Sequence, residues 1–478
     1  MIRFGTDGWR AVIADTFTFE NVRLIAQAVA DYVSKTHAGA GQPTVVIGYD
    51  TRFLSDRFAI ETARVMAGNE ITSWLTRTDA PTPAISYNVK EKGANAGIVI
   101  TASHNPPRYN GFKLKAGYGG SATADQCALV EEELALMERE GRTPNVMDYQ
   151  AALDKGLIRR FDPSWSYYQH LATLIDLDRI SERELNIVAD AMWGAGRGAF
   201  VSLLSRTRAH VTEIRGALNP GFGGIHPEPI LKHLNDLVAA VQRGQADIGL
   251  ATDGDADRIG AVDALGRFVD PHTVLALALR HLVECRGQTG EVVKTVSTTL
   301  MIDSLAKKHN LTLHETPVGF NHIADLMMKR DILIGGEESG GISLRGHIPE
   351  GDGILMGLLL LEIMAVSDAP LHEIIAGLQA EHGPAHYGRI DTHLQHQKPK
   401  KQMTAFLVDH APSSINGELV ARVDTLDGVK FYMSDGSWLL IRPSGTEPVL
   451  RIYAEARSTE AVRGLLEEGA KMGQRVTQ

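Results

Sequence analysis

The chain has 478 residues, of which 44% are hydrophobic, and its formal net charge is -10 at pH 7. A chain of this length is too long for one hydrophobic core, so we expect three or four domains. The negative charge argues against nucleic acid or an anionic membrane as the main partner, although a local basic pocket can still hold a small phosphate.

The N-terminal segment MIRFGTDGWR lacks the apolar core of a signal peptide. The longest apolar run, residues 354–366, contains Glu362 and is shorter than the roughly 20 residues that span a bilayer. Cys127 and Cys285 belong to no CxxC pair, so the sequence indicates neither a disulfide framework nor a zinc site. We therefore expect a cytoplasmic protein.

Apolar strand-like runs alternate with helix-period segments through most of the chain. We expect helices at 55–67 and 130–140, and buried strands at 44–50, 96–102, 185–192, 246–253, 291–297 and 331–336. Repetition of strand and helix predicts parallel α/β layers. Polarity alternates along the end of 438–456 as in a half-buried antiparallel strand, which indicates a different kind of domain at the end of the chain. The polar segment 381–401, which precedes it, indicates a linker and the entry to that domain.

The segment TASHNPP follows the apolar run at 98–100 and places Ser103 and His104 in front of two prolines. A surface turn is one interpretation, since Ser, Asn and Pro are common turn residues. A nucleophilic serine is the other, because a hydroxyl at a junction between strand and loop is held firmly and still reaches a cleft. These residues alone leave both interpretations open.

The segment TDGDADRIG carries Asp253, Asp255 and Asp257 directly after an expected buried strand. Three carboxylates so close together repel one another unless a divalent cation binds them. An EF-hand loop is excluded, because Arg258 stands at its glycine position and Ala264 at its glutamate position. A magnesium site for phosphate chemistry fits better, with Arg258 balancing phosphate charge, and a solvated acidic turn is the alternative.

Two further polar loops interrupt expected strands. GGEESGG (335–341) offers Glu337 and Ser339 as partners for adjacent sugar hydroxyls, a weak signal on its own. RPSGTEP (442–448) combines a guanidinium, hydroxyls and an exposed backbone, which together favour a phosphate cradle over a plain hairpin turn; its residues are Arg442, Ser444, Gly445 and Thr446.

A third glycine-containing segment loosely matches the dinucleotide fingerprint. Gly194, Gly196 and Ala199 follow an expected strand, and Glu213 lies near the spacing of a ribose-binding acid. This interpretation leaves the Asp triplet, the Ser103 turn and the Arg442 loop unexplained, so we do not favour an oxidoreductase. The sequence also lacks a Walker A motif, which argues against the usual nucleotide hydrolases.

Five segments together resemble the α-D-phosphohexomutase superfamily of phosphoglucomutases and phosphomannomutases. In chain order they are FGTDGWR (4–10), TASHNP (101–106), DGDADR (253–258), GEESGG (336–341) and RPSGTEP (442–448). The resemblance implies three α/β mixed-sheet domains and a C-terminal α+β domain around a central cleft. We expect these domains at 1–152, 153–262, 263–380 and 381–478.

The resemblance also implies roles for individual residues. Ser103 would carry the phosphoryl group, with His104 beside it, and Lys113 resembles the family's general acid/base lysine, with Arg10 close by. The Asp triplet would bind Mg²⁺ together with a phosphate oxygen on Ser103. Arg258, Glu337, Ser339 and His347 would contact substrate in the central part of the chain. The phosphate that is not being transferred would bind Arg442, Ser444, Gly445 and Thr446.

The activity so implied is the Mg²⁺-dependent interconversion of hexose 1-phosphate and hexose 6-phosphate through a 1,6-bisphosphate, with glucose 1,6-bisphosphate as activator. Glucose phosphates are the expected substrates. Dual glucose and mannose activity, glucosamine or N-acetylglucosamine phosphate mutase activity, and a non-catalytic sugar-phosphate-binding relative are the alternatives. We expect a monomer or a homodimer that binds hexose phosphate, with no nucleic-acid or membrane partner.

Three positions depart from common family patterns. Gly341 stands where many mannose-active relatives have His, and Asn321 and Gly351 stand where Lys is frequent. Because these positions are expected to contact substrate phosphate, His347 and Lys294 are possible substitutes.

Overall fold

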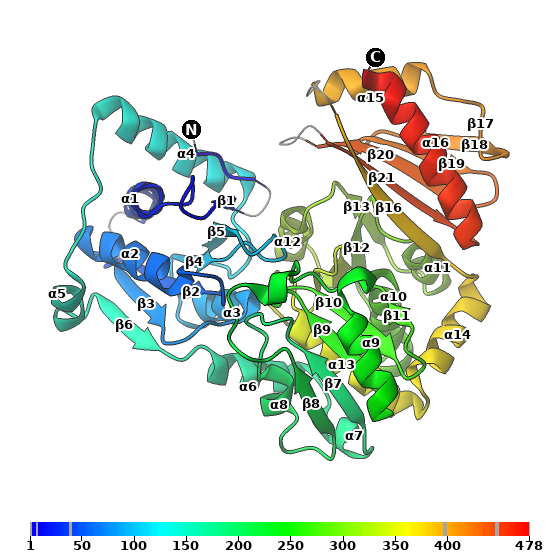
Figure 1. Cartoon of the computed structure of the whole chain (residues 1–478), viewed down its shortest axis with the longest axis horizontal. Helices are drawn as coiled ribbons and strands as arrows, with labels where there is room; N and C mark the ends of the chain where they lie inside the picture. Colours follow the sequence, from blue (N-terminus) through cyan, green and yellow to red (C-terminus); the bar gives the residue numbers. More distant parts are fainter. Residues whose placement is uncertain (1, 6–7, 38–40, 395–398, 445–448, 478) are drawn as a thin grey trace.

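The computed structural model describes residues 2–5, 8–37, 41–394, 399–444 and 449–477. Four sheets succeed one another along the chain, and Figure 1 shows each with its own helices. The expected class, three mixed α/β domains and a C-terminal α+β domain, is confirmed. We refer to the units built on the four sheets as domains I to IV.

Domain I is built on a six-stranded sheet in the order β1-β5-β4-β2-β3-β6. The strands are β1 (Trp9–Val12), β2 (Thr44–Tyr49), β3 (Thr72–Thr76), β4 (Ala96–Ile100), β5 (Tyr109–Ala116) and β6 (Ile158–Phe161). Its helices are α1 (Phe19–Thr36), α2 (Ser55–Gly68), α3 (Thr82–Glu91), α4 (Ala124–Glu140) and α5 (Tyr149–Asp154). Since β6 pairs with β3, the first sheet extends beyond the boundary expected at residue 152.

Strand β5 is absent from the elements that we expected, and it lies antiparallel to β4. Its lysines, Lys113 and Lys115, suggest an exposed segment, yet both side chains are completely buried. Charged residues are rarely buried unless they are paired, so a sequence pattern alone does not indicate this strand. The expected helix at 130–140 begins earlier, at Ala124, where Thr123 and Gln126 form a capping box.

Domain II has a five-stranded sheet in the order β11-β10-β9-β7-β8. The chain enters it through α6 (Ser164–Leu174) and α7 (Leu177–Ser181). The strands are β7 (Asn186–Asp190), β8 (His210–Ile214), β9 (Ile248–Thr252), β10 (Ile259–Asp263) and β11 (Phe268–Val269). Helices α8 (Ala199–Leu203) and α9 (Asn235–Gly244) and two short 3₁₀ turns, Phe222–Gly224 and Leu231–His233, complete it.

Domain III has a four-stranded sheet in the order β13-β12-β14-β15. Its strands are β12 (Glu291–Thr295), β13 (Leu313–Thr316), β14 (Ile332–Gly336) and β15 (Ile342–Leu344). Its helices are α10 (Pro271–Arg280), a π-helical turn at His281–Cys285, α11 (Met301–Lys308), α12 (Phe320–Lys329), α13 (Gly353–Ser367) and α14 (Leu371–His382).

The apolar run at 354–366 forms most of α13, which is buried in one hydrophobic cluster with side chains of domains II and III. Within the described ranges no single helix is long and apolar enough to cross a membrane; only α13 and α14 taken together reach that length, and they are bent by 83°.

Domain IV is a six-stranded antiparallel sheet in the order β16-β21-β20-β19-β18-β17 with two helices. The strands are β16 (His386–His393), β17 (Ser414–Ile415), β18 (Glu418–Asp424), β19 (Val429–Met433), β20 (Trp438–Pro443) and β21 (Val449–Ala456), and the helices are α15 (Lys400–Asp409) and α16 (Thr459–Thr477). The antiparallel strand predicted at the end of 438–456 is confirmed as β21, but the expectation that it is half-buried is wrong, because Tyr453 and Glu455 on its second face are buried as well.

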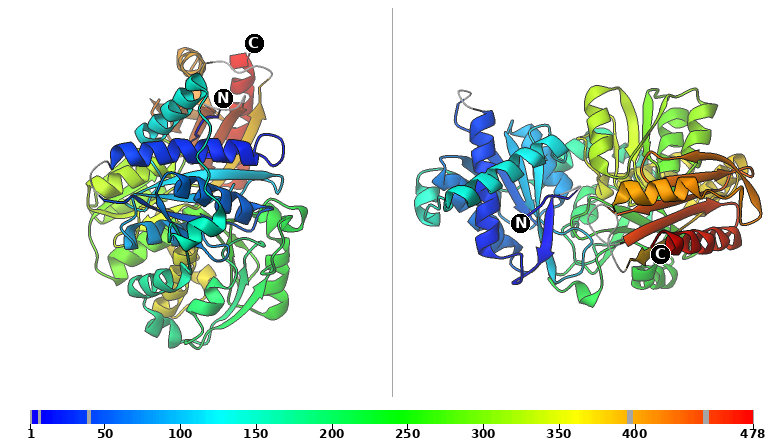
Figure 2. Two further views of the ribbon diagram at one scale, coloured as in Figure 1. Left: turned by 90° about the vertical axis from the view of Figure 1, so that its left-hand side faces the viewer. Right: turned by 90° about the horizontal axis from the view of Figure 1, so that it is seen from above.

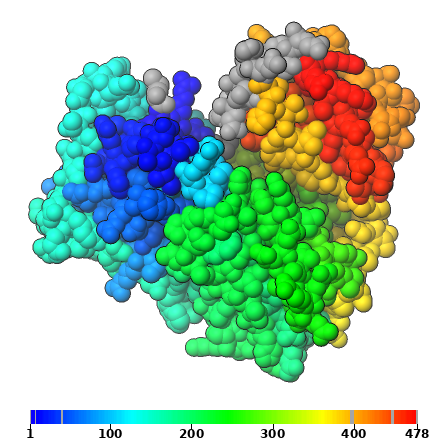
Figure 3. All heavy atoms as spheres, viewed as in Figure 1, coloured from blue at the N-terminus to red at the C-terminus, as the bar shows by residue number. Residues whose placement is uncertain are grey.

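The four domains are arranged around a hollow. The view from above in Figure 2 shows domain I at one end of the molecule and domains III and IV side by side at the other. In Figure 3 the surface is hollowed between domain I and domain IV, above domain II. The loops described next come from different domains and are brought together by this arrangement.

Candidate active site

The Asp triplet forms the turn between β9 and β10 of domain II. Carboxylate oxygens of Asp253, Asp255 and Asp257 lie within 4.8 Å of one another, and Asp253 and Asp255 are completely buried. Burial, together with the charges of Asp257 and Asp255, raises the pKa of Asp253 well above its usual range. Ionisation of all three carboxyl groups is therefore unfavourable in this turn unless a cation lies beside them.

Ser103 reaches the triplet from domain I. It follows β4, is 1% exposed, and its Oγ donates a hydrogen bond of 2.6 Å to Asp253 Oδ2. His104 Nδ1 lies 3.2 Å from the same Oγ. The structure thus contradicts the surface-turn interpretation of TASHNPP, because a buried hydroxyl that meets a distant carboxylate is not a solvated turn residue.

Lys113 on β5 also contacts the triplet. Its Nζ lies 2.9 Å from Asp255 Oδ2 and 2.9 Å from Asp257 Oδ2. Thr82, the first residue of α3, donates from its Oγ1 to Asp255 Oδ2 at 2.6 Å and from its backbone N–H to the Asp255 carbonyl at 2.8 Å. Sequence reasoning missed Thr82, since nothing in its local sequence links it to a loop of another domain.

The residues around Ser103 carry positive charge. Arg10 on β1 donates to Asn105 Oδ1 at 2.7 Å, two residues beyond Ser103. Burial and the cations Arg258 and Arg10 hold the pKa of His104 well below its usual range. His104 is therefore a neutral imidazole at pH 7, able to donate one hydrogen bond and accept another.

The triplet is joined directly to the GEESGG loop of domain III. Arg258 and Gly341 form an isolated antiparallel β-bridge. Burial opposes the charge of Arg258, but Asp257 and Asp253 outweigh it and raise the pKa of this guanidinium. Burial and the neighbouring Glu338 raise the pKa of Glu337 to about 7, and Ser339 Oγ donates to its carboxylate. The loop therefore presents a carboxyl group and a hydroxyl next to a fixed cation.

The RPSGTEP loop connects β20 and β21 of domain IV. Arg442 Nε donates to Asp427 Oδ2 at 2.6 Å, and the Ser444 backbone N–H donates to the Val449 carbonyl at 2.9 Å. Burial disfavours the charged form of Arg442, but Asp427 outweighs it and raises the pKa. Gly445 and Thr446, which we also expected in the phosphate cradle, lie outside the described residues.

The two proposed substitutes in domain III are engaged elsewhere. His347 Nδ1 lies 3.0 Å from His170 Nε2, and His347 Nε2 lies 3.0 Å from Asp352 Oδ2. Lys294 is buried against Asp303 and the Thr299 carbonyl. These contacts give no support to a substrate-binding role for either residue, and that role stays a prediction.

The two unusual glycines lie against each other beside the triplet. A β-carbon on Gly351 would lie 2.9 Å from Gly341 Cα and 2.8 Å from the Asp257 carbonyl oxygen. Any larger residue at 351 would require the backbone to shift, which gives a physical reason for glycine at this position in this chain.

The segment that resembles a dinucleotide fingerprint has a structural explanation. A β-carbon on Gly194 would lie 2.7 Å from the Asp253 carbonyl oxygen, so this glycine lets the loop after β7 pack on the Asp turn. Glu213 accepts a hydrogen bond of 2.6 Å from the Gly198 backbone N–H at the start of α8. Neither contact requires a nucleotide.

The residues of the Asp turn suit a magnesium ion. Asp257 Oδ1 is buried and accepts no hydrogen bond from any residue in the described ranges. The ammonium of Lys113 already lies against two of the three carboxylates, so the space accepts a cation. Carboxylate oxygens are the ligands that Mg²⁺ prefers in proteins.

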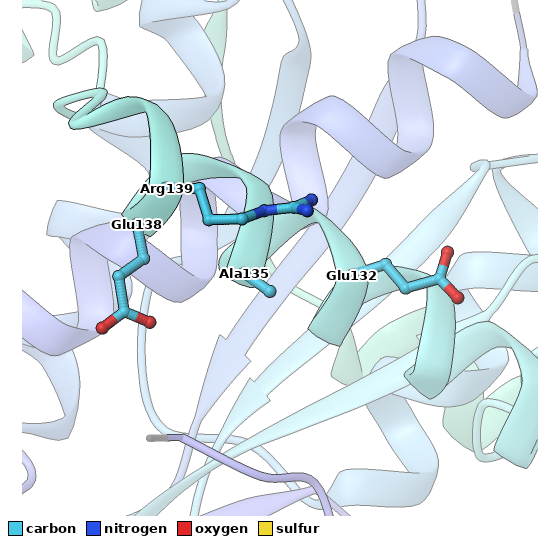
Figure 4. A pocket seen from close by; sticks show the side chains of 4 residues that line it. All are labelled: Glu132, Ala135, Glu138 and Arg139. Carbon is cyan, nitrogen blue, oxygen red and sulfur yellow. The ribbon is translucent and has the colours of Figure 1, made fainter.

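A cavity of about 520 Å³ lies elsewhere, on the outer face of α4, lined by Glu132, Ala135, Glu138 and Arg139. Figure 4 shows that the carboxylates of Glu132 and Glu138 point away from each other, and all four residues come from one helix. Such an open hollow lacks the convergent polar groups of a substrate site.

Comparisons with known proteins show the family of the chain. Family models match all four parts of the chain: phosphoglucomutase/phosphomannomutase domains I (1–139), II (165–266) and III (270–381), and the C-terminal domain (397–472). A phosphoglucomutase/phosphomannomutase of Thermococcus kodakarensis is 31% identical over 98% of both chains. A phosphoglucosamine mutase of Methanococcus aeolicus is 32% identical over 90% of this chain and 91% of that one.

Solved structures are similar as well. A protein of Thermus thermophilus, provisionally named a phosphomannomutase, superposes with a TM-score of 0.86 at 35% identity over 99% of both chains. The N-acetylphosphoglucosamine mutase of Aspergillus fumigatus was solved with GlcNAc-6P and magnesium. Its TM-score is 0.62 at 16% identity, over 100% of this chain and 96% of that one, so it shares the fold.

Proposed function

Because the chain belongs to the phosphoglucomutase/phosphomannomutase family and is an isomerase-class phosphohexomutase, we propose that Ser103 is its phosphoryl carrier and that glucose phosphates are its substrates. The observation that carries this proposal is the 2.6 Å contact between Ser103 Oγ and Asp253, inside a triplet that Lys113 also contacts. An alcohol, a cluster of carboxylates and an amine converge there from two domains.

In the proposed reaction, phosphorylated Ser103 gives its phosphoryl group to the free hydroxyl of a hexose monophosphate. The bond between Ser103 Oγ and phosphorus breaks as the bond between the sugar oxygen and phosphorus forms. The proton of the sugar hydroxyl finally resides on Ser103 Oγ, and Lys113 carries it between the two oxygens. The resulting 1,6-bisphosphate turns over and returns its other phosphate to Ser103 by the reverse step.

The remaining residues bind and orient the sugar. Glu337 and Ser339 hold its hydroxyls, while Arg442 and Ser444 hold the phosphate that is not transferred, and Arg258 balances charge beside the Asp turn. Asp253, Asp255 and Asp257 would hold Mg²⁺, and a bound Mg²⁺ would supply positive charge beside the phosphoryl group. Either end of the bisphosphate must reach Ser103, which requires the other phosphate to bind away from it; Arg442 and Ser444 lie on a separate domain and suit that requirement.

Glucosamine phosphate is a second candidate substrate, because relatives about 30% identical over nearly the whole chain carry the name phosphoglucosamine mutase. Glucose remains the first choice, since the GEES sequence at 336–339 resembles the glucose-preferring branch of the family. Both substrates use the same serine and the same triplet, so the choice concerns only the sugar-binding residues.

Phosphorus NMR tests the proposal. The enzyme is mixed with Mg²⁺, a trace of glucose 1,6-bisphosphate and equal amounts of glucose, mannose and glucosamine 1-phosphates. We expect glucose 6-phosphate to form first. A dominant glucosamine or mannose 6-phosphate signal would contradict the proposed substrate, and persistence of all three 1-phosphates would contradict the assignment to these sugars.

A matched pair of variants tests the serine. Ser103→Ala is expected to abolish isomerisation while sugar-phosphate binding stays measurable by calorimetry. Ser205→Ala, on the exposed surface of domain II, is expected to turn over like the natural enzyme. Turnover by Ser103→Ala would remove Ser103 from its role.

A further inference from the structure

Arg52 lies in the loop between β2 and α2 and meets the Ser103 loop along most of its length. Its Nη2 donates to the carbonyls of Ser103 (2.5 Å) and Asn105 (2.7 Å), and its Nη1 donates to those of Pro106 (2.9 Å) and Tyr109 (3.1 Å). The Nε donates to Asp50 at 3.1 Å. A guanidinium has five N–H donors, and each of the five has an acceptor here.

The guanidinium is completely buried between the Ser103 loop and domain II. Its side-chain exposure is 0%, and the ring of Phe222 from domain II lies 4.9 Å from its central carbon. The salt bridge to Asp50 offsets the cost of burying this charge. The hydrogen bonds of Arg52 go to the loop and to Asp50, while its charge also acts through space on Asp253, Asp255 and His104, so a test of its positioning role must keep the charge.

Asp50 extends the same network to the other side of Ser103. Its Oδ2 accepts a hydrogen bond of 2.6 Å from Thr101 Oγ1, which in turn accepts one of 2.9 Å from the Ser103 backbone N–H. Its Oδ1 accepts from Ser55 Oγ at 2.8 Å. The backbone N–H and the carbonyl of Ser103 are thus both fixed, the first through Thr101 and the second by Arg52 directly.

Ser103 needs such support because its backbone is strained. Its φ is +49°, in the left-handed region that residues other than glycine seldom adopt. Its carbonyl oxygen also packs closely on the Asp turn, where a β-carbon on Gly254 would lie 2.5 Å from it. Strained backbone of this kind persists only where surrounding contacts impose it.

We propose that Arg52 is a positioning residue for phosphoryl transfer: it holds the Ser103 loop in its left-handed conformation so that Oγ points at the Asp triplet. This inference rests on the proposed role of Ser103. Misplacing a reacting atom by about 1 Å can cost about 100-fold in rate. Because Arg52 has no contact in common with the phosphate cradle at Arg442, the loss should appear in kcat and not in KM.

Arg52→Lys is the decisive variant, since an ammonium has three donors and cannot bind four carbonyls and a carboxylate at once. We expect kcat to fall about 100-fold while KM for glucose 1-phosphate stays within about threefold. In a single turnover followed by phosphorus NMR, the phosphoserine signal should appear and then decay slowly, as the phosphoryl group passes from Ser103 to the sugar. Arg52→Met should be slower still.

The matched control is Arg64→Lys. Arg64 is partly buried in the same domain and donates to a backbone carbonyl, that of Met147, at 3.0 Å, yet it lies on α2 and has no contact with the Ser103 loop in the structure. Its kcat should equal that of the natural enzyme. If Arg52→Lys does not fold, Thr101→Val tests the same network from its other end, with an expected loss in kcat of about tenfold and an unchanged KM.

A kcat of Arg52→Lys within threefold of the natural value would overturn the inference, and so would a rise in KM at constant kcat. Where Arg52→Lys does not fold, an unchanged kcat for Thr101→Val would overturn it. Failure of the proposed function gives a different result, because the natural enzyme itself would then neither form phosphoserine nor turn over.

Discussion

Removal of the buried Lys115 ammonium should loosen domain I from domain III. Lys115 lies on β5, two residues after Lys113, and its Nζ is 2.6 Å from Oε2 of Glu350, which precedes α13 in domain III. The two side chains are 0% and 4% exposed, and Ser86 Oγ also donates to Glu350 Oε2 at 3.0 Å. Strand β5 thus contacts domain II through one lysine and domain III through the next.

The expected magnitude follows from this burial. Removing one partner of a buried ion pair costs about 3–5 kcal/mol, because the other charge stays buried without it. Each 1.4 kcal/mol is a factor of ten, so local opening of the interface in Lys115→Met should become at least about 100-fold more frequent. Hydrogen exchange of peptides covering 109–116 and 342–353 measures that opening directly.

Lys35→Met is the control, because Lys35 forms a pair of the same length with Glu133 in domain I but is 59% exposed. Its loss should cost at most about 1 kcal/mol, a change in exchange of about fivefold or less. The double variant Lys115→Met/Glu350→Leu should recover most of the protection, since it leaves no buried charge at the pair. Equal exchange in Lys115→Met and Lys35→Met would refute the reasoning.

Three other contacts give further predictions. Asp255→Asn should lower the rate at least about 100-fold and abolish Mg²⁺ binding in calorimetry; unchanged binding would reject the metal assignment. Arg442→Lys should raise KM for hexose phosphate about tenfold or more, because an ammonium lacks the planar fork; an unchanged KM would place the phosphate elsewhere. Burial opposes ionisation of Glu362, but hydrogen bonds from His281 and Arg286 bring its pKa to about 2, below its ordinary 4.5. This stabilisation is present above pH 4.5 and disappears as pH falls through about 2, so Glu362→Gln should cost about 3 kcal/mol at pH 7 and little at pH 2 in denaturant melts; a cost that does not change with pH would contradict it.

Much of the fold could be predicted from local pattern. Buried strands such as β4 and β14 are continuous runs of apolar residues and glycine, and turn residues or helix-period segments bound them, so the runs themselves predict the strand positions. The short motifs that we propose for the chemistry were also recognisable, because three aspartates in five residues or an Arg-Ser-Gly loop favour a ligand over a plain turn.

Strand β5 shows where this reasoning ends. Its lysines indicate an exposed segment until the acids that neutralise them are known, and those acids lie in two other domains, at Asp255, Asp257 and Glu350. The pairing of distant charges is a property of the packed domains, and no local pattern encodes it.

The sequence by itself determined which residues can do chemistry here and the order in which the domains follow one another. Tertiary structure decided which of those residues meet: Ser103 with Asp253 across 150 positions, and Arg52 with the carbonyls of a loop about 50 positions away. The physical reason is that propensity and burial periodicity act over a few residues, whereas the acceptors of a buried guanidinium are set by how separate loops cross in space.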